Sequence, residues 1–124
     1  MLEHSRAFGG FSVDDIAAAR TFYADTLGLR VTEAEGRLTL HLAGDRDTVV
    51  YPNSAHVPAA FTILNFPVPD VDAAVDGLTA RGVVFTVNEH TDERGVQRRY
   101  GPPIAWFTDP AGNILSVIQM SPSG

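Results

Sequence analysis

The chain has 124 residues, of which 44% are apolar and 19% charged, and its formal net charge is −6 at pH 7. It has no cysteine, which excludes disulfides, thiolate nucleophiles and cysteine-based zinc sites. All nine basic residues are arginine, which excludes Schiff-base chemistry at a lysine, and the acidic balance argues against nucleic acids and anionic membranes as partners. Because no apolar run reaches the roughly 20 residues that cross a bilayer, and residues 1–12 lack a targeting pattern, we expect a cytoplasmic protein.

The first half of the chain is predicted to form a strand, a helix and three further strands. The first strand alternates around Phe11 and Val13 and leads into Asp15, a residue type that caps helices well. The helix extends to Leu27 with apolar residues at helical spacing, and Gly28 is suited to a left-handed C-cap. The three further strands cover residues 29–33, 37–43 and 48–52.

The second half is predicted to repeat this order. A strand ending near Val68 leads into Asp70 as a helix cap, and the helix ends before Gly82. Three strands then cover residues 83–87, 103–108 and 114–119. The stretch "DPAG" at 109–112 has Asp first, Pro second and Gly fourth, which is typical of a type I turn and predicts a hairpin.

The two halves also share sequence. Residues Phe11 and Phe66, Val13 and Val68, and Asp15 and Asp70 pair at one constant offset. We therefore predict an α+β fold made of two βαβββ modules, each a curved mixed sheet with one helix. The modules cover about residues 7–53 and 61–120 of a single 1–124 domain, and they are joined near residues 53–60.

A long polar insertion, "NEHTDERGVQRRYGPP" at 88–103, fits neither period and contains three of the nine arginines. Long loops in compact domains are often functional or mobile. The insertion is interpreted either as a solvated loop or as a lid that offers a guanidinium to an anionic ligand.

Two segments carry a resemblance to a known family. The doubled βαβββ order, with "DIAAARTFYADTLGLRV" at 15–31 and "AWFTDPAGNILSVIQ" at 105–119, resembles the vicinal-oxygen-chelate superfamily of glyoxalases, bleomycin-resistance proteins and extradiol dioxygenases. The similarity extends from about Phe8 to Gln119. It implies a concave, glyoxalase-like sheet site where catalytic members hold a metal through His, Gln or Glu on a first strand and Glu on a last strand. Such an ion acts as a Lewis acid on adjacent substrate oxygens.

The positions that this resemblance assigns to metal ligands carry other residue types here. They fall on Phe8 and Ile63 in the first strands, on Ser116 in the last strand, and on Val50 or Tyr51 in the first half. A divalent transition metal needs imidazole or carboxylate ligands, and the four histidines show no recognised ligand spacing. We therefore predict no metal and no cofactor, with His4, His56 and His90 on the surface.

His41 is the one histidine with a candidate role. In "LTLHL", Leu38, Leu40 and Leu42 should face the helix-covered side, so that Thr39 and His41 face the concave side. An imidazole there suits a general base or a hydrogen-bond donor to a ligand. A hydrogen-bonded structural histidine fits the pattern equally well.

Alternation supplies the remaining candidates for an apolar pocket with sparse polar groups, which is typical of ligand sites. The same apolar residues would also fit a core or a dimer interface. The predicted pocket residues are Phe8, Thr39, His41, Ile63, Asn65, Arg98, Tyr100, Trp106 and Ser116.

The sequence thus favours a metal-independent protein of the glyoxalase/bleomycin-resistance type that binds a small organic molecule in a concave sheet cavity. The alternative is an enzyme, a lyase, isomerase or dioxygenase, that uses either a non-standard metal site or His41 as a metal-free acid or base. A structural or protein-interaction module also stays open. The resemblance implies a homodimer.

Overall fold

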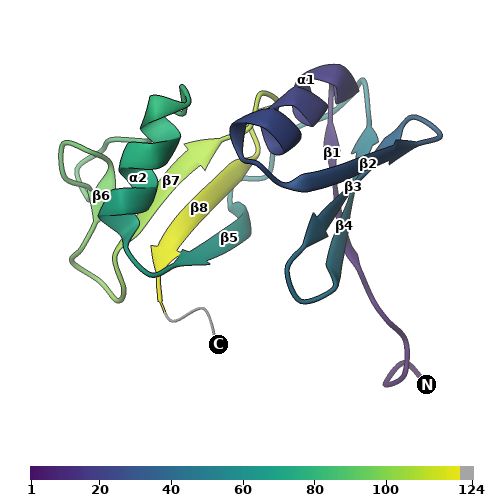
Figure 1. Ribbon diagram of the computed structural model, residues 1–124, viewed down its shortest axis with the longest axis horizontal. Coiled ribbons are helices and arrows are strands. Elements are labelled where there is room, and N and C mark those ends of the chain that lie inside the picture. Colours follow the sequence, from purple (N-terminus) through teal and green to yellow (C-terminus); the bar gives the residue numbers. More distant parts are fainter. Residues whose placement is uncertain (121–124) are drawn as a thin grey trace. The chain divides into compact units, whose positions relative to one another are not determined.

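A computed structural model describes residues 1–120 of the chain, which form two compact units, Met1–His56 and Val57 onwards. Figure 1 shows that each unit contains one helical segment and one sheet. Over the described residues, no helix is long and apolar enough to span a bilayer. The α+β fold with two four-stranded mixed sheets confirms the predicted class.

The first unit has a sheet in the order β1-β4-β3-β2, in which β1 runs parallel to β4 and the other neighbours are antiparallel. Its elements are β1 (Gly9–Val13), α1 (Ile16–Arg20), η1 (Thr21–Thr26), β2 (Arg30–Ala34), β3 (Arg37–Leu42) and β4 (Arg46–Pro52). Leu38 and Leu40 of β3 are fully buried, while Thr39 and His41, which alternate with them, are partly exposed. The predicted alternation is confirmed over residues 38–41, whereas Leu42 is partly exposed.

The helical segment of the first unit differs from the prediction. Asp15 caps it as expected, because its side chain accepts a hydrogen bond from the backbone N–H of Ala18 at 3.1 Å. After Arg20, however, the α-helix continues as the π-helix η1, in which the N–H of Leu27 donates to the carbonyl of Phe22 at 2.9 Å. The wider turn is a change in backbone hydrogen bonding that apolar spacing does not reveal.

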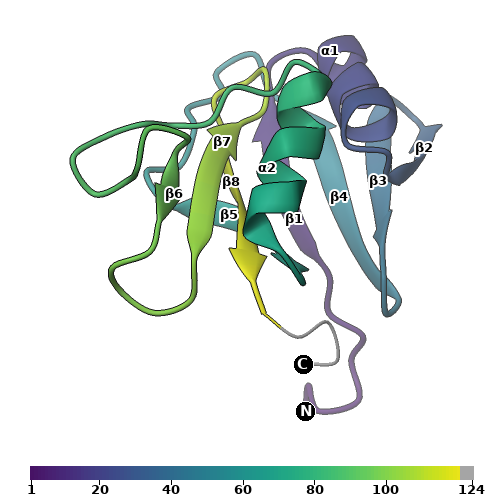
Figure 2. The same ribbon diagram turned by 60° about the vertical axis from the view of Figure 1, so that its left-hand side comes forward.

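The second unit has the corresponding sheet order β5-β8-β7-β6, again with one parallel pair, β5 and β8. Its elements are β5 (Thr62–Val68), α2 (Val71–Ala80), β6 (Val96–Gln97), β7 (Ile104–Thr108) and β8 (Ile114–Gln119). Figure 2 shows α2 lying across the sheet. Asp70 caps α2 by accepting from the N–H groups of Asp72 and Ala73, and Gln119 of β8 accepts from the N–H of Val71 at 3.0 Å.

The predicted strand over residues 83–87 is wrong. Val83 and Phe85 are buried and Val84 and Val87 are exposed, so the segment is extended with one face covered. It does not form a ladder, and the edge strand beside β7 is instead β6, from within the polar insertion. The alternation of apolar residues in a segment indicates which of its side chains are buried. It does not indicate whether the backbone of that segment pairs with a neighbouring strand.

The hairpin between β7 and β8 confirms the predicted turn. The N–H of Gly112 donates to the carbonyl of Asp109 at 3.0 Å. The buried carboxylate of Asp109 also accepts from the N–H groups of Ala111 and Asn113, both at 2.9 Å, and from the side-chain amide of Asn113 at 2.9 Å. These bonds fix the register of the two strands that carry the candidate site.

Candidate ligand pocket in the second unit

The sheet of the second unit has one covered face and one open face. On β7 and β8, Ala105, Phe107, Leu115 and Val117 are buried, and α2 contacts both strands. The intervening residues alternate to the other face, where Trp106 pairs across the strands with Ser116 and Thr108 pairs with Ile114. A pocket of about 580 Å³ lies on this second face.

The pocket is lined by aromatic side chains and by neutral hydroxyl and amide groups. The lining residues are Ala60, Phe61, Thr62, Thr86, Asn88, His90, Gln97, Tyr100, Trp106, Thr108 and Ile114. Phe61 and Tyr100 are 68% and 66% exposed, so two large aromatic rings border the opening. No arginine, aspartate or glutamate occurs among these lining residues.

Trp106 is the only tryptophan in the sequence, and its indole is held in place. Its Nε1–H donates to the hydroxyl of Thr62 at 3.2 Å, from β7 to β5. Because the one polar atom of the ring is satisfied, the rest of the indole can present hydrocarbon to a ligand.

Ser116 and Asn65 lie in register with Trp106 but form a polar pair of their own. Ser116 is fully buried and its hydroxyl donates to Oδ1 of Asn65 at 2.7 Å. Asn65 pairs with Ser116 across β5 and β8, as Trp106 does across β7 and β8. Ser116 and Asn65 therefore lie in the sheet next to the pocket, and neither is one of its lining residues.

Ile63 sits at an irregularity in β5. Thr62 pairs with Ile114 and Leu64 pairs with Leu115, so two residues of β5 span one step of β8. This bulge turns Thr62 towards the pocket, and Thr62 rather than Ile63 is a lining residue. The sequence contains no glycine or proline at this point that would have indicated the bulge.

Gln97 is a lining residue that the sequence analysis missed. It is 8% exposed, and its Oε1 accepts from the backbone N–H groups of Arg99 and Tyr100, while its Nε2 donates to the carbonyl of Tyr100 at 3.2 Å. Its position inside a polar insertion concealed it. The apolar residues Gly95 and Val96 directly before it were the available signal in the sequence.

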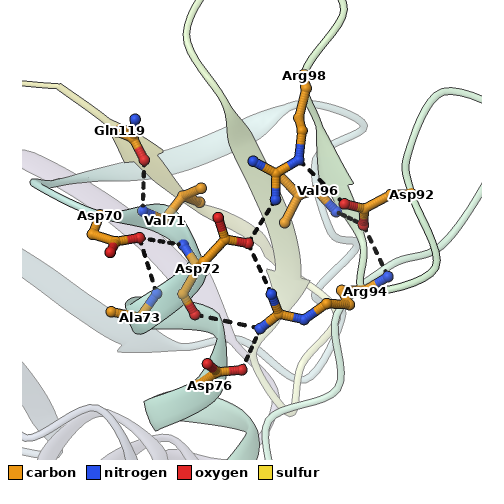
Figure 3. Close-up of polar contacts among 10 residues, drawn as sticks. All are labelled: Asp70, Val71, Asp72, Ala73, Asp76, Asp92, Arg94, Val96, Arg98 and Gln119. Carbon is orange, nitrogen blue, oxygen red and sulfur yellow. Dashed lines mark hydrogen bonds and ion pairs between the residues drawn. The ribbon is translucent and has the colours of Figure 1, made fainter.

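Arg98 points to the helix side instead. Figure 3 shows its guanidinium beside Asp72 of α2 and Asp92, with Nη2 at 2.6 Å from Asp72 and Nε at 3.3 Å from Asp92. Arg94 joins the same cluster through Asp72 at 2.8 Å and through Asp76. The hydrogen bond to Asp72 raises the pKa of Arg98.

The pKa of Asp92 is lowered although burial alone would raise it. The backbone N–H groups of Val96 and Arg94 donate to its carboxylate at 3.0 and 2.9 Å, and Arg98 adds a hydrogen bond and a positive charge. These interactions outweigh burial because they stabilise the ionised form. The cluster fixes the start of the 88–103 insertion against α2.

Three predicted site residues lie in the first unit. Phe8 precedes β1, is 69% exposed, and shares with Thr39 a second pocket of about 680 Å³. That pocket is more highly charged, and its lining residues are Ser5, Arg6, Ala7, Phe8, Thr39, Asp45, Asp47 and Val49. His41 has a bond at each ring nitrogen: Nδ1 lies 3.1 Å from Asp47 Oδ1, and Nε2 lies 2.8 Å from Thr32 Oγ1.

The other histidines are also placed. His90 is an exposed residue at the pocket of the second unit. His56 is half-buried rather than on the surface, because its Nδ1 lies 2.6 Å from the hydroxyl of Ser12. Over residues 1–120, no group of three or more histidine, aspartate or glutamate side chains is arranged to hold a metal ion.

Comparison with known proteins decides the family. Residues 7–117 match the family model described as the glyoxalase/bleomycin resistance protein/dioxygenase superfamily. The chain belongs to this superfamily. Comparison with curated protein sequences gives no match.

Solved structures of superfamily proteins share the fold. A glyoxalase family protein from Enterococcus faecalis is 18% identical with a TM-score of 0.71, covering 95% of this chain and 99% of its own. The fosfomycin resistance protein FosX from Listeria monocytogenes is 11% identical with a TM-score of 0.72, covering 94% and 93%. TnmS3, an antibiotic binding protein from Streptomyces sp. CB03234, is 25% identical with a TM-score of 0.68, covering 95% and 98%.

Proposed function

We propose that this superfamily member is a metal-independent binding protein for a small organic molecule, held in the pocket on the open face of the second sheet. The observation that carries the proposal is the lining of that pocket. Trp106, Tyr100 and Phe61 surround a volume of about 580 Å³ together with neutral hydroxyl and amide groups. Ligand sites are commonly apolar and aromatic with a few polar groups that orient the ligand.

The residues at the family's metal positions support metal independence. Ile63 has no donor atom, and Phe8 has none either. The hydroxyl of Ser116 already donates to Asn65. A neutral hydroxyl in a buried strand is a poor substitute for the imidazole or carboxylate that transition metals require.

The lining also favours a class of ligand. Aromatic faces suit planar rings, and the hydroxyl groups of Thr62, Thr86 and Thr108 can exchange hydrogen bonds with ether, carbonyl or hydroxyl groups. The lining contains no carboxylate or guanidinium, and its one ionisable base is the imidazole of His90, so a neutral aromatic compound fits it best. The similarity to the antibiotic binding protein TnmS3 supports a ligand of antibiotic type.

The surroundings of His41 favour binding over metal-free acid–base catalysis. Asp47 lies beside Nδ1 and Thr32 beside Nε2, so both ring nitrogens have partners within the first unit. A general base must lie within hydrogen-bond reach of the proton it takes from a substrate, and His41 is not among the lining residues of either pocket. Both contacts are consistent with a structural histidine in an antiparallel sheet.

Within this proposal the chain works as one domain of two modules, as a homodimer in the cytoplasm. Light scattering on a sizing column tests the dimer, which is expected at twice the mass of 13.3 kDa. An elution mass of one chain at micromolar concentration contradicts it.

A fluorescence titration tests the proposed function. Neutral planar aromatic compounds, including Nile red and aromatic antibiotics, are expected to change the emission of Trp106 with saturation, because Trp106 lines the pocket. A ligand at a hundred times its dissociation constant is expected to stabilise the fold by about 2.7 kcal/mol in thermal unfolding. Elemental analysis of untagged protein is the control, and a stoichiometric transition metal contradicts the proposal.

A further inference from the structure

The side chain of Gln97 bonds to the turn that follows it. Its Oε1 accepts from the N–H groups of Arg99 and Tyr100, and its Nε2 donates to the carbonyl of Tyr100. One amide therefore satisfies three main-chain groups of a segment that lies outside any strand. A buried amide that places three of its four hydrogen-bonding positions on one turn fixes the backbone conformation of that turn, because losing it leaves several main-chain groups unsatisfied.

This turn carries a wall of the pocket. Tyr100 lines the pocket, yet its side chain is 66% exposed, so packing of its ring does little to hold it. Gly101, with a φ of 67°, and two prolines follow it, and this segment contains no regular structure. The position of Tyr100 therefore depends on the main-chain bonds that Gln97 makes.

The backbone of Gln97 is anchored independently of its side chain. In β6, Val96 pairs with Ala105 and Gln97 pairs with Ile104 of β7. On the helix side, Arg98 is tied to Asp72 and Asp92, as Figure 3 shows. Removal of the Gln97 amide therefore frees the turn at 99–100 while β6 stays in the sheet.

We infer that Gln97 is a positioning residue of the ligand pocket: it holds the turn at 99–100 so that Tyr100 forms a wall opposite the sheet strands, and thereby sets which ligands fit. The inference rests on the proposed function, since it assigns Gln97 a role in that same pocket. Although Gln97 is itself a lining residue, the inference predicts that its side chain acts on ligand affinity mainly by holding Tyr100 in place.

Hydrogen exchange tests the hold on the turn without any ligand. Gln97→Ala and the similarly sized Gln97→Met are expected to speed amide exchange at Arg99 and Tyr100 by about tenfold, measured by NMR, because both N–H groups lose their acceptor. Gln119→Ala is the matched control: the chain's other glutamine also accepts a backbone N–H, that of Val71, but does not line the pocket. Unchanged exchange at Arg99 and Tyr100 in both Gln97 variants overturns the inference.

A double-mutant cycle with Nile red tests the role in binding. Gln97→Met and Tyr100→Ala are each expected to weaken Nile red binding about tenfold, and the double variant is expected to be no weaker than Tyr100→Ala alone. Gln119→Ala is expected to bind as the wild type does. Additive losses, about a hundredfold together, overturn the inference because they place Gln97 in direct contact with the ligand.

The two arms separate this inference from the proposed function. If the wild type shows no saturable binding of Nile red while exchange rises in the Gln97 variants, the proposed neutral aromatic pocket is wrong, and the role of Gln97 in it falls with it. If Nile red binds and the Gln97 variants bind it as tightly as the wild type, the proposed function stands and the positioning role is wrong.

Discussion

The two units share one topology but present different chemistry on their sheets. The orders β1-β4-β3-β2 and β5-β8-β7-β6 correspond strand by strand. The pocket of the first unit contains Arg6, Asp45 and Asp47, whereas that of the second contains Phe61, Tyr100 and Trp106. The duplicated fold therefore fixes where side chains project, and the individual residues decide what a surface can bind.

The edge strands show where the two units diverge. In the first unit β2 has five residues and follows the helix closely, while in the second unit β6 has two residues and lies after a long extended segment. The shortened edge lets the chain fold back, so that Gln97 and Tyr100 contribute to a pocket. An insertion at a sheet edge can thus build a site while the central strands stay the same.

The largest expected effect is on ligand affinity when the aromatic character of the second unit is removed. Trp106→Ala should weaken the binding of a neutral aromatic ligand by about a hundredfold, because a buried aromatic face supplies much of the contact area. Isothermal titration calorimetry measures this without relying on tryptophan emission. Val84→Ala, an exposed apolar position outside the pocket, should bind as the wild type does, and equal affinity of Trp106→Ala places the ligand elsewhere.

The next effect contrasts one hairpin turn of each unit, that between β7 and β8 and that between β3 and β4. Asp109→Asn should lower the free energy of unfolding by about 2 kcal/mol, because its buried carboxylate accepts three hydrogen bonds and an amide cannot accept all of them. The matched variant Asp45→Asn lies in the exposed turn of the first unit, at a φ of 59° that asparagine tolerates. It should change the free energy by less than about 0.5 kcal/mol in urea denaturation. Equal losses would mean that the Asp109 bonds add nothing.

The smallest effect concerns the arginine cluster. It distinguishes the two interpretations of the 88–103 insertion, a solvated loop and a lid that offers a guanidinium to an anionic ligand. Arg98→Gln should leave the affinity for a neutral ligand unchanged and lower the free energy of unfolding only slightly, since its ion pairs with Asp72 and Asp92 are partly exposed to solvent. Titration of the variant with neutral and anionic aromatic ligands measures the affinities, and urea denaturation measures the free energy of unfolding. A selective loss of the anionic ligand would instead support a lid that offers its guanidinium to the ligand.

The regular parts of the fold followed from the sequence. Asp15 and Asp70 as helix caps and the turn after Asp109 depend on local hydrogen bonds, which nearby residue types determine. The two faces of β7 followed from its alternation, which placed Trp106 opposite the buried Phe107.

Other features could not be predicted because they depend on distant partners. The ladder on the outer edge of β7 is made by Val96 and Gln97 of β6, while residues 83–87 form no strand and reach β7 through the N–H of Thr86, which donates to the carbonyl of Trp106 at 2.8 Å. The π-helix after Arg20 and the bulge at Ile63 are differences in backbone hydrogen bonding. The pattern of apolar and polar side chains does not determine them. Gln97 was missed although its three bonds go to main-chain groups only two and three residues away, because it lies within a polar insertion.

The bulge in β5 also limits what counting along the chain can establish. If Ile63 were deleted, Thr62 and Leu64 would become consecutive residues, and Thr62 and Asn65 would still project from the same side of a regular strand. Relatives with and without the extra residue would therefore place the same side chains of β5 on the pocket face, although their residue numbers would differ by one. With or without the extra residue, the side chain at that position is that of Thr62, and neither Thr62 nor Ile63 carries the imidazole or carboxylate that a transition metal would need.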